Sequence, residues 1–225
     1  QCNVAVGRNA LTANTSASYN TAVGHSSMLK TTTGFANTAI GLFSMACNTE
    51  GDASVAIGYE SLLNNTTADS NIAIGCKAMR ANTTGHSNTA IGTLALDANT
   101  TADGNTAVGF CALSSNTTGA NNTAIGNNAM YEGTTTGDFN TMVGVSSGRK
   151  MTSGNQNTSS GVNSMESTTT GGCNTAMGMS ALTANTTGAT NTALGHQSLA
   201  AVTTGSGNVA VGFRSGFAYQ TSSNN

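Results

Sequence analysis

The motif Asn-Thr-Ala-(Ile/Val)-Gly recurs along the whole chain, and its glycine returns every 17 residues. That spacing is too short for two packed helices and fits no heptad, but it matches one turn of a β-helix, in which each coil adds a rung of about 4.8 Å. The sequence therefore predicts an all-β fold, a parallel β-solenoid (β-helix or β-roll) of 13 coils with a 17-residue repeat. The repeat glycines are Gly7, Gly24, Gly41, Gly58, Gly75, Gly92, Gly109 and Gly126, followed one residue late by Gly144, Gly161, Gly178, Gly195 and Gly212.

The repeat also predicts the domain organisation. We expect a single β-solenoid domain over residues 1–219, with a one-residue insertion near Gly133, and a polar C-terminal tail over 220–225. Numbered from its Asn, each coil reads N-T-A-I-G-x-x-A-L-x-x-N-T-T-G-x-x, which accommodates three short extended segments around T-A-I, A-L and N-T-T. Glycines at positions five and fifteen suit corners with a positive φ. The absence of Pro suits a backbone whose N–H groups join ladders between coils.

Two apolar columns are expected to form the core, one from position four and one from position nine of each coil. One coil cannot bury these side chains alone, so neighbouring coils must supply the stability. The predicted core residues are Ile40, Ile57, Ile74 and Ile91 at position four and Leu62, Leu96 and Leu113 at position nine. Because side chains alternate along a strand, the Ala at position three would then point outward as a flat packing strip. The alternative is that the Ala is small because a thin coil has no room for more.

Asparagine occupies position one in twelve of the thirteen coils, with Ser54 as the exception. Stacked Asn side chains can hydrogen-bond along the solenoid axis and satisfy polar groups at a corner without water. We therefore expect a structural Asn ladder that includes Asn71, Asn88, Asn105 and Asn122.

Charge and residue spacing argue against several classes of function. Only 7% of the residues are charged and the net charge is −2, so a nucleic acid partner is not expected. No apolar run is long enough to cross a bilayer, so no membrane insertion is expected. The three histidines, His25, His86 and His196, lie in different coils, whereas a catalytic or zinc site needs converging side chains. We expect no catalytic residues, no enzymatic activity and no firm cofactor.

A weak Ca²⁺ site is a candidate at position sixteen, where Asp52, Asp69 and Asp103 recur around His86. Adjacent rungs would bring such carboxylates to about 5 Å of one another, close enough to share a cation. The alternative is a solvated corner.

Five N-T-T sequons and the N-T-S sequon at Asn14 fall at one coil position, twelve, and are candidates for glycosylation. The alternative is that Asn and Thr serve the turn through local hydrogen bonds. The N-T-T sequon residues are Asn65, Asn82, Asn99, Asn116 and Asn185.

The repeat resembles the heads of trimeric autotransporter adhesins, and more closely the N-T-A-(I/V)-G-x-x-A-L-x-x-N-T-T-G arrays of phage and viral tail-fibre-like proteins. The resemblance covers nearly the entire chain. It implies a β-roll displayed on a cell or virion surface, commonly as three chains side by side. We therefore expect a non-enzymatic, extracellular structural or adhesive rod in a surface fibre, filament or adhesin. Its expected partners are further copies of itself, as a lateral trimer or an end-to-end filament, and a cell-surface or glycan receptor.

Ice binding is the alternative function. Paired threonines such as Thr83 and Thr84 or Thr100 and Thr101 recur in successive coils, so at least one Thr per coil must face outward. Such a threonine ladder resembles the ice-binding surface of antifreeze β-solenoids.

Overall fold

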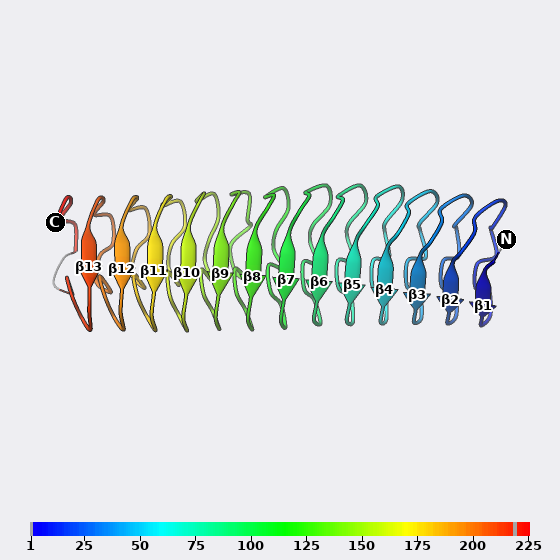
Figure 1. The fold of residues 1–225 in the computed structure, drawn as a ribbon, viewed down its shortest axis with the longest axis horizontal. Coiled ribbons are helices and arrows are strands. Elements are labelled where there is room, and N and C mark those ends of the chain that lie inside the picture. The colour runs from blue at the N-terminus through cyan, green and yellow to red at the C-terminus, as the bar shows by residue number, and fades with distance from the viewer. Residues whose placement is uncertain (1, 218–219) are drawn as a thin grey trace. The chain divides into compact units, whose positions relative to one another are not determined.

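The computed structural model describes residues 2–217 and 220–225, which belong to two compact units, Gln1–Thr118 and Gly119–Asn225. In both units the chain winds into stacked coils, each with one three-residue parallel strand on the same side (Figure 1). The predicted all-β parallel solenoid with a 17-residue repeat is confirmed. The structural repeat has the same length as the sequence repeat because each 17-residue coil makes one complete turn of the solenoid.

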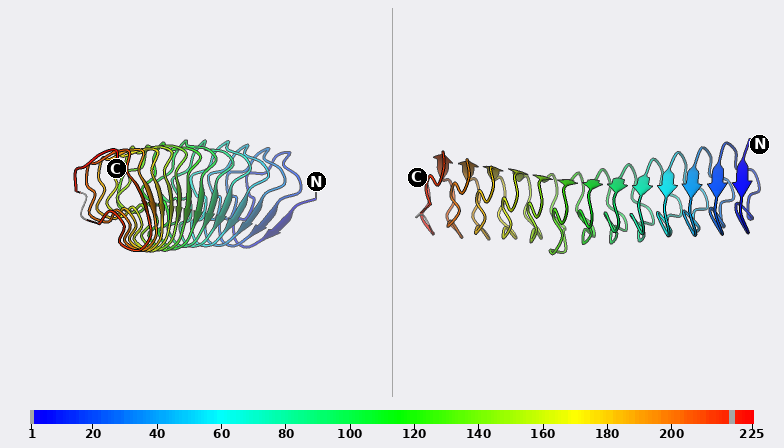
Figure 2. Two further views of the ribbon diagram at one scale, coloured as in Figure 1. Left: turned by 60° about the vertical axis from the view of Figure 1, so that its left-hand side comes forward. Right: turned by 90° about the horizontal axis from the view of Figure 1, so that it is seen from below.

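Unit one holds seven strands that pair in sequence order. The register is regular: Thr89 lies opposite Thr106, Ala90 opposite Ala107 and so on, always 17 residues apart. Figure 2 shows the strands of the unit on one side and the turns behind them. The strands are β1 (Val4–Val6), β2 (Thr21–Val23), β3 (Thr38–Ile40), β4 (Val55–Ile57), β5 (Ile72–Ile74), β6 (Thr89–Ile91) and β7 (Thr106–Val108).

Unit two holds six strands, and its first pair shows the insertion. Thr123 of β8 lies opposite Thr141 of β9, an offset of 18, whereas the later pairs return to 17. The extra residue falls in the turn after Gly133, where Thr134 is exposed and Thr135 is buried, so the strands keep their register. The strands are β8 (Thr123–Ile125), β9 (Thr141–Val143), β10 (Thr158–Ser160), β11 (Thr175–Met177), β12 (Thr192–Leu194) and β13 (Val209–Val211).

The expectation of three extended segments per coil is wrong for the second and third segments, which form turns and bends. Positions seven, nine and seventeen adopt left-handed backbone conformations, as at Glu60 (φ 52°), Leu62 (φ 51°) and Ser70 (φ 59°), and these interrupt an extended chain. Hydrogen bonds between coils persist there: the Leu62 N–H donates to the Ala78 carbonyl at 3.0 Å.

The two repeat glycines have different roles. Gly58 at position five has a φ of 132°, and a Cβ there would lie 2.5 Å from the Gly75 carbonyl oxygen, so the stacking requires glycine. The glycine at position fifteen was also expected to have a positive φ, but Gly85 does not. A Cβ on Gly85 would clash with the Ala102 carbonyl oxygen and lie 2.6 Å from the Oδ1 of Asn82, so this coil packs closely around its glycine. The neighbouring coils carry alanine at the same position, at Ala68 and Ala102.

The strand residues face opposite to the prediction for position four. The position-three alanines are buried, as Ala39 and Ala56 show with no exposed surface, while Ile40 and Ile91 are each 39% exposed. The predicted core role is therefore wrong for these two residues and for their half-exposed neighbours, Ile57 and Ile74. The coil is too thin to hold a branched side chain on this strand beside the buried column from position nine.

That position-nine column is confirmed as the apolar core. Its large side chains have no exposed surface and stack between the strand alanines and the buried Asn side chains. In unit one the fully buried members are Met28, Met45, Leu62, Met79, Leu96 and Leu113, and in unit two they are Met130, Met165, Leu182 and Leu199.

One coil of unit two exchanges the sizes of two core side chains. Gly148 replaces the large residue at position nine, and Met142 replaces the small alanine at position three. The Met142 Sδ lies 2.8 Å from the point where a Gly148 Cβ would stand, and Met142 has no exposed surface. The methionine thus fills the space that glycine leaves, because a close-packed interior tolerates no void.

The polar segment at 220–225, expected as a tail, continues the stack of unit two. Thr203 N–H donates to the Gln220 carbonyl at 2.8 Å, and Asn208 Nδ2 donates to the Ser222 carbonyl at 2.8 Å. Asn225 N–H donates to Asn208 Oδ1 at 3.2 Å. The expected domain boundary at residue 219 lies outside the described residues.

Because position four faces outward and position nine faces inward, truncating the two side chains of one coil should have different effects on stability. Leu62→Ala should lower the free energy of unfolding by about 2–5 kcal/mol, because it opens a cavity between coils. Ile57→Ala should cost about 1 kcal/mol or less, because its partly exposed side chain lies on the outer side of the strand, where truncation opens no internal cavity and mainly strand preference is lost. Urea denaturation followed by circular dichroism measures both, and equal losses would contradict the observed orientation.

Candidate functional site

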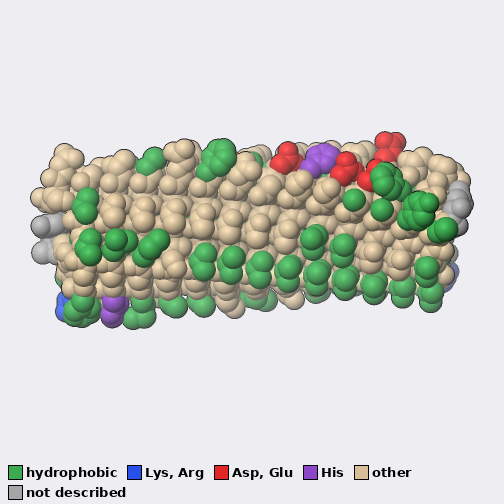
Figure 3. All heavy atoms as spheres, in the orientation of Figure 1, with side chains coloured by type: hydrophobic (Ala, Val, Ile, Leu, Met, Phe, Trp, Pro, Cys, Tyr) green, Lys and Arg blue, Asp and Glu red, His purple; other side chains and the backbone are tan. Residues whose placement is uncertain are grey.

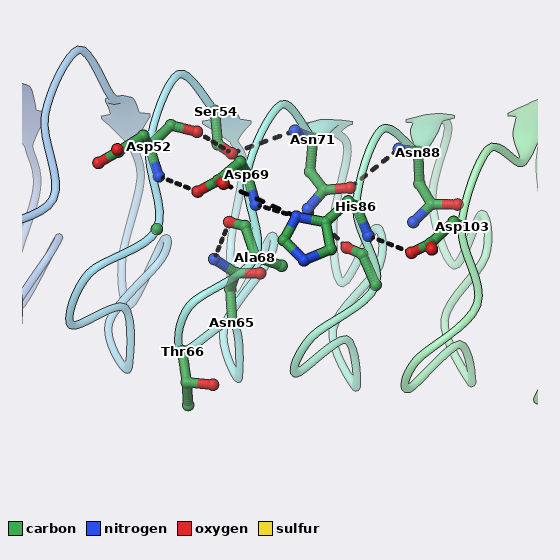
Figure 4. Close-up of polar contacts among 12 residues, drawn as sticks. Asp52, Ser54, Asn65, Thr66, Ala68, Asp69, Asn71, His86, Asn88 and Asp103 are labelled. Carbon is green, nitrogen blue, oxygen red and sulfur yellow. Dashed lines mark hydrogen bonds and ion pairs between the residues drawn. The ribbon is translucent and has the colours of Figure 1, made fainter.

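The Asn side chains at position one form the predicted ladder inside each unit, and Figure 4 shows part of the ladder of unit one. In unit one, Asn71 Oδ1 accepts the Asn88 backbone N–H at 2.9 Å, and Asn88 Oδ1 accepts that of Asn105 at 2.9 Å. The amide nitrogen donates to the carbonyl at position fifteen of the same coil, 14 residues on, as Asn71 Nδ2 does to Gly85 at 2.8 Å. In unit two, Asn122 Oδ1 accepts from Asn140 in the same way at 2.9 Å. The ladder is confirmed, but its main links join a side-chain amide to the backbone.

Ser54, the one exception at position one, keeps the ladder intact. Its backbone N–H donates to Asn37 Oδ1 at 2.9 Å, and its hydroxyl oxygen accepts the Asn71 N–H at 3.1 Å. A hydroxyl therefore replaces the amide oxygen as the acceptor for the coil above.

A second Asn ladder, not anticipated from the sequence, occupies position twelve of unit one. Here the amides do bond to one another: Asn82 Nδ2 donates to Asn65 Oδ1 at 3.1 Å, and Asn99 Nδ2 donates to Asn82 Oδ1 at 2.9 Å. Asn82 Nδ2 also donates to Gly85 O at 3.0 Å, so the carbonyl of Gly85 accepts from both ladders.

Burial overturns the glycosylation hypothesis for the five N-T-T sequons of the folded protein, whereas Asn14 in the first coil is partly buried. All five sequon asparagines are buried with no exposed surface, and their amide nitrogens face the interior. A glycan needs an accessible amide nitrogen, so these positions serve the turn. The residues concerned are Asn65, Asn82, Asn99, Asn116 and Asn185.

The acidic column at position sixteen caps backbone N–H groups of the preceding coils. Asp69 Oδ1 accepts the Asp52 N–H at 2.8 Å, His86 Nδ1 accepts the Asp69 N–H at 3.0 Å, and Asp103 Oδ1 accepts the His86 N–H at 2.7 Å (Figure 4). His86 can take its place in the column only with Nδ1 unprotonated, because that nitrogen is the acceptor. Among the described residues, no group of three or more Asp, Glu, His or Cys side chains is arranged to hold a metal ion.

Ion pairs in the turns also run along the stack. In unit two, Arg149 lies between Glu132 and Glu166, with N–O distances of 2.9 and 2.6 Å. In unit one, Arg80 Nε lies 3.5 Å from Asp97 Oδ1. Burial raises the pKa of the Asp97 carboxyl above its ordinary value, and the Arg80 guanidinium offsets only part of that effect.

The paired threonines divide their roles. At position thirteen the hydroxyl is already used within the stack, as Thr66 Oγ1 donates to the Thr83 carbonyl at 3.1 Å and Thr83 Oγ1 donates to the Thr100 carbonyl at 3.0 Å. At position fourteen the side chains of Thr84 and Thr101 are exposed. The expected outward threonine is thus the second of each pair.

The outer side of the strands carries an apolar surface, which we call the strand face: positions two, four and six of the coils of unit one. Position two holds Thr, Val or Ile and position four holds Val or Ile. Figure 3 shows rows of hydrophobic side chains on unit one. Its most exposed members in coils three to seven are Ile40 (39%), Leu42 (40%), Tyr59 (42%), Ile72 (38%), Ile91 (39%) and Phe110 (50%).

The sequence does not reveal this face as long as the large side chains at position four are assumed to be buried. The signal that could have revealed the orientation is the small residue at position three of nearly every coil. A side chain that points into a thin coil must be small, whereas one that points outward need not be.

The residues that could support catalysis lie apart from one another. His25 packs against the Phe43 ring, with centroids 5.6 Å apart, whereas His196 packs against Phe213 at 5.4 Å and His86 sits in the acidic column. The described residues enclose no pocket. In that same part of the chain, no helix has the length and apolar character needed to span a membrane.

Comparison of the chain with protein families, with curated proteins and with solved structures finds no significant match.

The second ladder leads to a prediction about stability. Asn82→Ala should lower the free energy of unfolding by about 2–5 kcal/mol, because it leaves Asn65 Oδ1 without its Asn82 donor and removes one of the two acceptors of Asn99 Nδ2, which keeps only the Ala102 carbonyl. Asn64→Ala, at an exposed position of the preceding coil, should cost no more than about 0.5 kcal/mol. Thermal and urea denaturation compare the two, and similar stabilities would refute a stabilising role for the ladder.

Proposed function

We propose that this chain is a non-catalytic structural or adhesive element, a β-solenoid segment of an extracellular fibre, filament or adhesin on a cell or virion surface. Self-association and a cell-surface or glycan receptor are its proposed interactions. The proposal rests on how the recurring polar groups are used.

The single observation that supports it most is that the recurring buried polar side chains bond to neighbouring coils. Both Asn ladders and the position-thirteen hydroxyls hydrogen-bond along the axis of each unit. Groups held in this way resist separation of the coils but are not available to a substrate. A catalytic site instead needs positioned polar groups that converge in a concave site.

The expected mechanical behaviour is stepwise unfolding under load. When the ends of the chain are pulled apart in a single-molecule force experiment, coils should detach one or a few at a time. Each coil of 17 residues should release about 60 Å of extended chain. Recurrent steps of that size, or multiples of it, support a load-bearing role. Smooth extension without resistance would argue against a structural element.

Ice binding is the second candidate, supported by the strands of unit two. Position two is threonine in five successive strands of this unit, and these side chains point outward in a regular row, unlike the hydroxyls at position thirteen. The row is Thr123, Thr141, Thr158, Thr175 and Thr192. A rigid, evenly spaced array of methyl and hydroxyl groups suits contact with an ordered water lattice.

Thermal hysteresis tests this second candidate. If the row binds ice, the chain should depress freezing and shape ice crystals, and Thr158→Lys with Thr175→Lys should abolish both effects by preventing close approach. Thr170→Lys with Thr187→Lys, at exposed positions off the strands, should leave them unchanged. An unmodified chain without hysteresis would eliminate ice binding.

A further inference from the structure

We propose that the strand face of unit one is a docking surface for a second copy of this chain. The inference deepens the proposed structural function by naming the surface and the partner.

The first argument is the chemistry of the face. Positions two and four of unit one carry no charged side chain, and position six carries only Arg8, at the first coil. Ile40, Tyr59 and Phe110 are 39–50% exposed, and the Lys77 ammonium lies over the Tyr59 ring at 6.0 Å from its centroid. Covering the rows at positions two and four removes apolar area from water without desolvating an ion, which is the favourable case for association.

The second argument is the period of the face, which points to the same chain as the partner. Because the strands are in register, like side chains stack in columns along the unit, with about 4.8 Å between one side chain and the next in a column. The columns form parallel ridges on the face. Ridges can interdigitate along their whole length only with a surface of the same spacing. A second copy supplies that spacing, as identical strands do in dry steric-zipper interfaces.

The third argument is the size of the face, which sets the expected strength. Seven rungs of about 4.8 Å and five positions of about 3.3 Å rise give a projected area on the order of 550 Å². A standard interface covers about 800 Å² on each partner. The face of unit one is therefore large enough for a weak association that depends on concentration.

The charges beside the face argue against an anionic membrane as its occupant. The acidic column, with Asp52, Asp69 and Asp103, runs along the same coils and would repel anionic headgroups. No cluster of Lys or Arg lies on the face to compensate.

Sedimentation under reducing conditions tests the pairing. The chain should pass from monomer to a larger species as its concentration rises from about 1 to about 100 μM. Ile40→Glu with Ile74→Glu should stay monomeric, because two charges would be buried between the copies. Thr67→Glu with Thr101→Glu adds the same charge at exposed positions off the face, where coil three already carries Glu50, and should associate like the unmodified chain.

Two natural cysteines locate the contact. Both Cys76, at position six of the strand face, and Cys173, in unit two and off the strands, are exposed. As the concentration rises, alkylation of Cys76 measured by mass spectrometry should slow several-fold while that of Cys173 stays constant. Equal rates at all concentrations would overturn the proposed surface.

The remaining outcomes separate this inference from the proposed function. A monomer at every concentration that still unfolds in steps under force would overturn the docking surface and leave the structural role standing. A monomer that floats with phosphatidylcholine vesicles would overturn it in favour of a lipid surface. Loss of stepwise unfolding would overturn the structural role itself, whatever the sedimentation shows.

Discussion

The fold depends on buried amide groups that are satisfied only by the next coil. An Asn side chain in the interior is costly unless its oxygen and nitrogen both have partners. In unit one, Asn82 has partners in its own coil and in the coils on either side, and Gly85 O accepts from two such amides. A shift of register by one residue would leave these groups unpaired, so the ladders define the register of every coil as well as stabilising it.

The thin interior follows from the same stacking. With Asn side chains at two corners and alanine on the strand, only position nine has room for a Leu or Met. The exchange of Met142 for alanine and Gly148 for the large residue shows that the volume of a coil is conserved even where its sequence departs from the repeat. Left-handed φ values at non-glycine positions such as Leu62 are the conformational cost of closing so small a coil.

The recurring buried polar side chains are engaged in hydrogen bonds within the stack. The outer surface is therefore formed by the remaining positions of each coil. On the strand side these are aliphatic and threonine side chains in register, and at the adjacent corner they are carboxylates that already cap backbone N–H groups. Such surfaces suit contact with other repetitive surfaces better than recognition of a small molecule. The proposed structural role and the proposed pairing through the strand face both follow from this division.

The sequence alone determined the period, the parallel stacking, the site of the insertion and the ladder through Asn71, Asn88, Asn105 and Asn122, because each of these depends only on like residues recurring every 17 positions. Which way a strand faces is a different matter. Alternation places Ala39 and Ile40 on opposite sides but is equally satisfied by either choice. Only the tertiary structure decided it, since the closed coil is too narrow for Ile40 beside Met45 and Asn37, and the same closure buried the sequon asparagines.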